Sequence, residues 1–125
     1  MIMPYVGDQL WRSKSVEKRE LEKIFDMDYK DARLAAEVHR RVRQDAVTWI
    51  KPGMKLIDIC RRLESTNQRL VEASGLSRGR AFPTGCSTNH TAAHYTPNTG
   101  DETILLSGDV LKVDFGTHVN GRIID

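Results

Sequence analysis

Several features that would assign this chain to a special class of protein are scarce or missing in its 125 residues. The two cysteines, Cys60 and Cys86, are too few for the disulfide framework of a small secreted protein, and they suit a reducing cytosol. No apolar run approaches the ~20 residues that a transmembrane helix needs. The first residues, Met-Ile-Met-Pro-Tyr, lack the basic and apolar regions of a secretory signal. We therefore expect a cytoplasmic protein that does not enter a membrane.

An excess of charge of one sign is also missing. Lysine and arginine number 19 and aspartate and glutamate 17, which leaves a net charge of +2. A dedicated nucleic-acid binder carries a more basic composition, so no specific nucleic-acid partner is expected. The chain is 39% hydrophobic and 29% charged, as is normal for a globular protein of about one domain in length. It contains no internal repeat.

A first amphipathic helix is predicted after an irregular segment at residues 1–12. The charged stretch at 13–23 favours a helix start at Ser13 or Ser15, with acids and bases spaced for surface pairs. From Tyr29 onward apolar residues recur at helical steps, and Pro52 ends the pattern because it has no N–H to donate. The expected buried stripe is Leu34, Val38, Val42, Ala46 and Trp49.

A second helix is expected from Leu56 to Ala73, closed by Gly75. The short connection between the two helices indicates an antiparallel helix pair. The apolar stripe of this second helix has one polar break, Asn67, and consists of Leu56, Ile59, Cys60, Leu63, Asn67, Leu70 and Val71.

The last part of the chain favours strands. Residues 76–103 are rich in Gly, Ser, Thr, Asn and Pro, and we expect a long irregular, functional segment there. One strand is predicted over 110–119, and Asn120-Gly121 is the strongest short-range signal for a two-residue type I′ hairpin. The return strand begins at Arg122. The fold class is therefore α/β of the α+β type, with helices first and strands with a hairpin after them.

The unequal lengths of the two hairpin strands indicate an incomplete fold. The outgoing strand has about ten residues, whereas the return strand has four, so a long apolar edge stays unpaired, which soluble proteins avoid. We expect residues 1–125 to be a single incomplete domain, the N-terminal portion of something larger.

Two carboxylates come close together on this hairpin. If the turn fixes the register, Asp114, Gly116 and His118 share one face with Asp125, because side chains alternate along a strand. Asp114 and Asp125 become diagonal neighbours at roughly 7 Å between Cα atoms, and Gly116 leaves open space opposite Asp125. Carboxylates that close repel each other unless a cation or proton lies between them. The same spacing also fits two solvated acids on an exposed face, and spacing alone favours that interpretation.

Four ordered motifs, with one upstream, resemble the type 2 methionine aminopeptidase family. The likeness extends from about Trp11 onward. The Ala-Ala-His-Tyr-Thr-Pro-Asn run is typical of type 2 members. The motifs are Trp49-Ile50-Lys51-Pro52-Gly53-Met54, Phe82-Pro83-Thr84-Gly85-Cys86-Ser87, Ala92-Ala93-His94-Tyr95-Thr96-Pro97-Asn98, Lys112-Val113-Asp114-Phe115-Gly116-Thr117-His118 and Gly121-Arg122-Ile123-Ile124-Asp125.

This resemblance implies a fold and a site. The fold is the N-terminal part of a pita-bread structure, and the cofactors are two divalent metal ions (Mn, Co, Fe or Zn) held by two Asp, one His and two Glu. Asp114 and Asp125 match the two Asp ligands, and the other three ligands have no counterpart here. His94 matches the active-site histidine that contacts substrate, and Phe82 matches a residue lining the methionine pocket.

The resemblance also implies an activity: removal of the initiator methionine from nascent peptide N-termini, in proximity to the ribosome. The given sequence lacks the long charged N-terminal extension of many eukaryotic members, which weakens the expectation of ribosome association. The 125-residue chain alone is predicted to be inactive, because part of the metal site is missing. The alternative is a non-catalytic pita-bread protein that binds RNA or protein partners. A third interpretation is a fragment that folds with or onto another partner.

The other histidines and the cysteines suggest less. His39 is expected to be exposed on a charged helix face. For His118 a metal-ligating role beside Asp114 is conceivable, and a hydrogen-bonding or surface role is preferred. Cys86 with His90 and His94 nearby suggests a thiol nucleophile only weakly, and Cys60 is expected to be a small buried hydrophobe.

Overall fold

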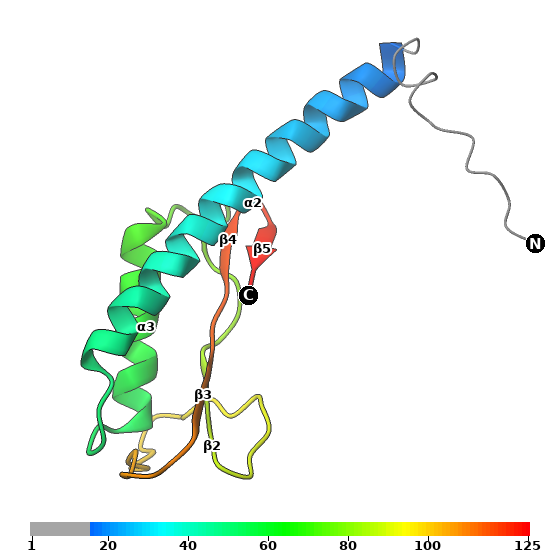
Figure 1. Ribbon diagram of the computed structural model, residues 1–125. Coiled ribbons are helices and arrows are strands. Elements are labelled where there is room, and N and C mark those ends of the chain that lie inside the picture. Colours follow the sequence, from blue (N-terminus) through cyan, green and yellow to red (C-terminus); the bar gives the residue numbers. More distant parts are fainter. Residues whose placement is uncertain (1–15) are drawn as a thin grey trace, which may run out of the picture. The chain divides into compact units, whose positions relative to one another are not determined.

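The computed structural model describes residues 16–125 (Figure 1). Its internal contacts divide the chain into two compact units, residues 1–30 and 31–125. The irregular segment expected at 1–12 and the helix start expected at Ser13 or Ser15 lie outside the described residues. That residues 1–125 form one incomplete domain stays a prediction. None of the helices within 16–125 is long and apolar enough to cross a membrane.

Helix α2 spans Val16–Trp49 and joins the two helical stretches that the sequence predicts separately. Its residues in the first unit are largely exposed. In the second unit a stripe at helical spacing is buried. The prediction that Leu34 lies on this stripe is wrong, because its side chain is 40% exposed. The stripe begins at the neighbouring Ala35 instead. The buried positions are Ala35, Val38, Val42, Ala46 and Trp49.

His39 is also buried in α2, which corrects the expectation of an exposed histidine. Its ring stacks on the ring of Phe115 with centroids 4.1 Å apart. Its Nε2 donates a hydrogen bond of 3.0 Å to the Phe115 carbonyl oxygen. An aromatic partner and an acceptor therefore satisfy both the apolar and the polar part of the imidazole.

Helix α3 spans Leu56–Leu70 and ends earlier than predicted. Figure 1 shows it running back along the second half of α2, as the short connection suggested, and both helices contribute to one buried core. Leu70 of the expected stripe is half-buried and the rest of the stripe is buried. The residue in the left-handed conformation just after the helix is Glu72, at φ +55°, and so Gly75 does not close it.

The strands form two small sheets instead of one hairpin. In the first sheet β4 lies between β1 and β5, and in the second β2 pairs antiparallel with β3. Two of these strands fall inside the segment 76–103 that we expected to be irregular. The strand bounds are β1 Arg78–Arg80, β2 Gly85–Thr88, β3 Leu111–Asp114, β4 Thr117–Val119 and β5 Arg122–Ile124.

The single strand predicted over 110–119 is broken between β3 and β4. At the break, the Gly116 carbonyl accepts hydrogen bonds from the Ala81 backbone and from Asn67 Nδ2, both at 2.9 Å. Phe115 is buried beside His39. Residues far away in the chain thus bond to the backbone between the two strands. β3 pairs with β2, and β4 pairs with β1 and β5.

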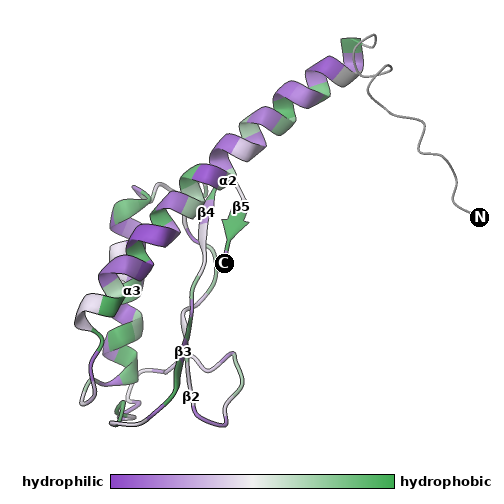
Figure 2. Cartoon of the chain, in the orientation of Figure 1, coloured by the Kyte–Doolittle hydropathy of each residue, from purple (hydrophilic) through white to green (hydrophobic). Residues whose placement is uncertain are grey.

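The hairpin between β4 and β5 has the predicted register. Thr117 pairs with Ile124, His118 with Ile123 and Val119 with Arg122. Asn120 and Gly121 have φ values of +47° and +78°, and a type I′ turn requires positive φ at both central residues. Figure 2 shows hydrophobic colouring on the arrow of β5, which contains two isoleucines after Arg122, whereas α2 and α3 have mixed colouring.

Candidate metal centre

The strand arrangement brings all four predicted site residues to one cavity of about 360 Å³. Asp114 is the last residue of β3, and Asp125 directly follows β5. The cavity is lined by Phe82, Pro83, Gly85, His94, Thr96, Asp114 and Asp125. The juxtaposition of the two carboxylates, which we expected from the hairpin register, is therefore present.

The charged form of Asp114 is disfavoured in this position. Its Oδ1 is buried, and no residue in the described part of the chain donates a hydrogen bond to it. Burial raises the pKa of Asp114, and the charge of Asp125 and hydrogen bonding with that carboxyl raise it further. The charge of His94 acts in the opposite direction. A cation near the two carboxylates would relieve the same repulsion.

The donor chemistry of the pair fits a divalent ion in part. Carboxylate oxygens are ligands for Mg, Ca, Mn and related divalent metals, and bridging carboxylates are needed where two ions lie close together. Within residues 16–125, however, no group of three or more histidine, cysteine, aspartate or glutamate side chains is arranged to hold a metal. The described residues therefore supply two ligands and not a complete site.

Phe82 takes the space that we expected to be open at Gly116. A Cβ atom built on Gly116 would lie 2.3 Å from Phe82 Cε1 and 2.8 Å from the Ala81 Cβ. The prediction of open space is wrong, because the aromatic ring fills it. Glycine at this position lets Phe82 pack directly on the backbone between β3 and β4 and form one wall of the cavity.

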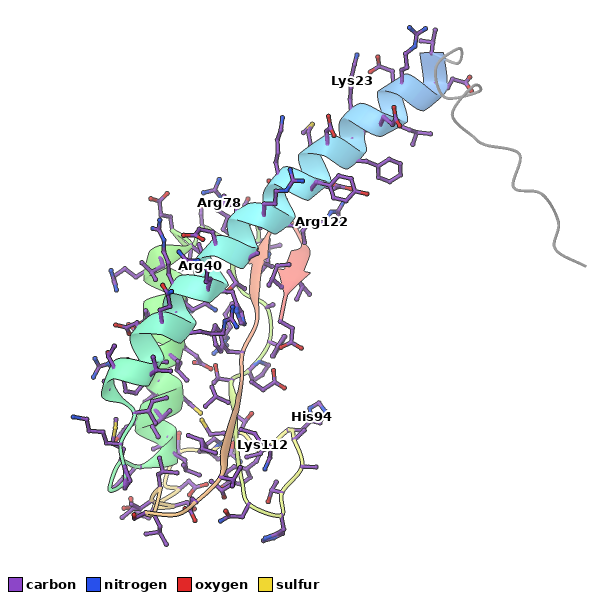
Figure 3. All side chains as sticks on the ribbon, in the orientation of Figure 1. Lys23, Arg40, Arg78, His94, Lys112 and Arg122 are labelled. Carbon is purple, nitrogen blue, oxygen red and sulfur yellow. The ribbon has the colours of Figure 1, made fainter. Side chains whose placement is uncertain are left out.

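His94 lies on the loop after β2, and Figure 3 shows its side chain at the outer side of that loop. Its φ of +64° is unusual for a residue other than glycine. The next residue fixes the loop to β2: the Tyr95 carbonyl accepts from the Cys86 backbone N–H at 2.7 Å. The Tyr95 N–H in turn donates to Ser87 Oγ at 3.2 Å. An exposed imidazole is thus held at the rim of the cavity.

Residues that our sequence reasoning missed support the site from β2 and its surroundings. Gly85 pairs with Asp114 across the strands, and a Cβ on Gly85 would lie 3.5 Å from the Asp114 Cβ. The Oε1 atom of Glu64 accepts a hydrogen bond of 3.2 Å from the Thr84 backbone N–H. Its Oε2 atom forms an ion pair with Arg80 Nη1 at 2.6 Å. Gly85 belongs to the motif quoted above, whereas no sequence signal pointed to Glu64.

His118 does not line the cavity. Its Nδ1 accepts a hydrogen bond of 3.4 Å from the Gly121 backbone N–H within the hairpin turn. It is a half-buried residue of β4, and its observed contact is the hydrogen-bonding role that we preferred.

Two carboxylates, one at the end of β3 and one directly after β5, share a cavity with an aromatic wall, and such a pair can contribute ligands to a catalytic metal centre. Residues 30–125 match the family described as metallopeptidase family M24, and the chain belongs to that family. The expected pita-bread α/β fold class is thereby confirmed. The matched residues nearly coincide with the second compact unit.

The chain is similar to proteins named methionine aminopeptidase 2, which confirms the resemblance seen in its motifs. It is 52% identical over 124 residues to methionine aminopeptidase 2A of Arabidopsis thaliana, covering 99% of this chain and 28% of that protein. For methionine aminopeptidase 2 of Schizosaccharomyces pombe the identity is 54%, covering 99% and 29%. For that of Dictyostelium discoideum it is 53%, covering 99% and 28%. The chain therefore spans less than a third of the length of these relatives.

The fold is also similar to a solved structure. The X-Pro aminopeptidase from Thermotoga maritima MSB8 superposes with a TM-score of 0.58 at 21% sequence identity, covering 82% of this chain and 29% of that one. At this identity the likeness concerns the fold alone.

Proposed function

We propose that this chain forms part of the active centre of a metal-dependent methionyl aminopeptidase, which removes the initiator methionine from nascent polypeptides. The observation that carries the proposal is the shared cavity of Asp114, Asp125, His94 and Phe82. Membership of a metallopeptidase family implies divalent metal ions. We further propose two ions (Mn, Co, Fe or Zn), a cytoplasmic location and proximity to the ribosome.

Asp114 and Asp125 would hold the metal. The chemistry that bound divalent ions supply is polarisation of the scissile carbonyl and activation of a water at neutral pH. The fold supports this role, because Asp114 at the end of β3 and Asp125 directly after β5 line one cavity. The Oδ1 atom of Asp114, which is buried and has no hydrogen-bond partner among the described residues, would gain an interaction from a cation.

The remaining residues of the cavity would position the substrate. Phe82 offers an aromatic wall to the methionine side chain. Its ring packs directly against the backbone of Gly116 on the other side. His94 at the rim can donate to or accept from the peptide that follows the methionine. The bond that breaks is the peptide bond after the first residue, and water supplies the hydroxyl of the new carboxyl group.

Metal removal tests the proposal. We expect the complete protein that carries this chain to release methionine from a Met-Ala-Ser peptide, to lose this activity after dialysis against a chelator, and to regain it with Mn²⁺ or Co²⁺. The 125-residue chain alone is expected to release none, because residues 16–125 supply only two metal ligands. Release by the complete protein that persists unchanged after the metal is removed would contradict the proposal.

A further inference from the structure

Two buried cysteines from different elements face each other behind the cavity. Cys60 in the middle of α3 and Cys86 in β2 are free thiols, 5% and 0% exposed, and their Sγ atoms are 3.1 Å apart. The catalytic proposal uses neither of them. A disulfide has an S–S bond of about 2.05 Å, so the sulfurs need to approach by only about 1 Å.

The backbone around both thiols keeps them aligned. Cys86 pairs with Val113 of β3, and its N–H donates to the Tyr95 carbonyl at 2.7 Å. Cys60 lies within the hydrogen-bonded part of α3, and its Sγ is 3.6 Å from the Thr84 carbonyl oxygen, which accepts from it. Backbone hydrogen bonds of α3 and β2 therefore position both cysteines at this contact.

The two thiols differ in their surroundings. Cys60 lines an open cleft of about 270 Å³ together with Arg61, Glu64 and Arg80, whereas Cys86 does not line it. The hydrogen bond with Cys86 lowers the pKa of the Cys60 thiol, although burial acts against this. The pKa of Cys86 is raised by its hydrogen bond with Cys60 and by burial. Thiolate character and access both favour attack at Cys60 first.

We propose that Cys60 and Cys86 are a reversible redox modification site, which a peroxide oxidises to an intramolecular disulfide that links α3 to β2. The Cys60 sulfur attacks one oxygen of hydrogen peroxide and becomes a sulfenic acid, while the other oxygen leaves as water. The Cys86 sulfur then attacks the Cys60 sulfur and expels a second water. Two thiols lose two electrons and two protons in total, and the peroxide gains them.

The link would act on the strand that lies next to the candidate metal centre. Gly85, adjacent to Cys86, pairs with Asp114. Because α3 and β2 would be joined covalently, we expect β2 and β3 to open less often, and the backbone N–H groups of residues 85–88 and 111–114 to exchange more slowly with solvent in the oxidised protein.

Peptide mapping tests this site on the purified wild-type protein. The protein is treated with hydrogen peroxide, alkylated after denaturation and digested with trypsin without reductant. Cleavage after Lys55, Arg61, Arg80 and Lys112 places the two cysteines in peptides 56–61 and 81–112. We expect these peptides to be recovered joined, two hydrogens lighter than their sum, from monomeric protein, and separated again by dithiothreitol.

The variants Cys60→Ala and Cys86→Ala are the matched controls, and each should lose the joined peptide. Met27, which is 64% exposed, reports in the same digest that the peroxide has reacted. Recovery of both cysteines as alkylated free thiols, in a wild-type sample in which Met27 is oxidised, would overturn the proposal. Links found only between two molecules, or oxidation of Cys60 to a sulfinic acid without the link, would also overturn it.

Discussion

Gly116 shows how a single residue shapes the cavity. A side chain at this position would meet the Phe82 ring at 2.3 Å and the Ala81 Cβ at 2.8 Å, distances at which a neighbour must move. We predict that Gly116→Ala displaces Phe82 and lowers the free energy of unfolding by roughly 1–3 kcal/mol, as overpacking does in other cores. Urea unfolding followed by circular dichroism measures this change.

Gly79→Ala is the matched control for that substitution. Gly79 lies in β1, and a Cβ there would meet only His118 Nε2, at an ordinary contact distance of 3.6 Å. Neither glycine has a left-handed backbone, so the comparison isolates the effect of crowding. Equal stability of the two variants would show that Phe82 does not pack on Gly116.

Asn67 is the second residue on which the break between β3 and β4 depends. Its Nδ2 donates to the Gly116 carbonyl at 2.9 Å, and its Oδ1 accepts from Thr117 Oγ1 at 2.7 Å. We predict that Asn67→Ala destabilises the protein, because it removes the acceptor of the buried Thr117 hydroxyl and one of the two donors to the Gly116 carbonyl. A buried group left unpaired costs roughly 1–3 kcal/mol. The exposed Gln68→Ala should change the unfolding free energy by less than about 0.5 kcal/mol. A similar small change for both substitutions would contradict this role.

At the scale of elements, His39 connects α2 to the segment between β3 and β4. Burial is the main cause that lowers the pKa of His39, and the charge of Arg43 adds to it. The hydrogen bond to the Phe115 carbonyl and the charge of Asp125 act in the opposite direction. An unfolded histidine has a pKa of about 6.5, so below that pH the unfolded chain binds a proton that the folded chain binds less readily.

A pH-dependent stability follows from this difference. The contribution of His39 is complete above pH ~6.5 and is lost as the pH falls from there toward the lower pKa of the folded state. We predict that the unfolding free energy falls more steeply between pH 7.5 and 5.5 in the wild type than in His39→Gln. Denaturant titrations across this range measure both slopes, and identical slopes would contradict the prediction.

The elements differ in how far the sequence alone predicts them. The two-residue turn predicted the register of β4 and β5, because a short turn sets the pairing of the strands that it joins. Asp114 and Asp125 lie just outside that pairing and line one cavity, as expected. The buried faces of α2 and α3 followed from helical spacing, apart from Leu34, Ala35 and His39 of α2. These features depend on residues that are near one another in the chain.

Features that depend on distant partners were missed. β1, with the sequence Arg-Gly-Arg, has no alternating pattern and exists because β4 pairs with it. His39 is buried because Phe115, 76 residues away, supplies both an aromatic face and an acceptor. The break after Asp114 is likewise set by Asn67 and Ala81 and not by the strand residues themselves.

At the scale of the whole molecule, the proposed metal site uses residues from one compact unit of the chain. It belongs to family M24 and spans less than a third of its methionine aminopeptidase 2 relatives. The two carboxylates, the aromatic wall and the rim histidine all lie in the unit 31–125. The proposed activity requires further metal ligands in addition to those of residues 16–125.

The most direct test of the central claim replaces Asp125 with asparagine in the complete protein and measures Mn²⁺ binding by calorimetry together with methionine release. Asparagine keeps the size of the side chain and removes its charge. The account predicts loss of metal affinity and of turnover by at least about tenfold, the scale on which even supporting residues of metal sites act. Asp58→Asn, an exposed carboxylate on α3, should leave both unchanged. Full Mn²⁺ binding and full turnover in the Asp125→Asn protein would contradict the account.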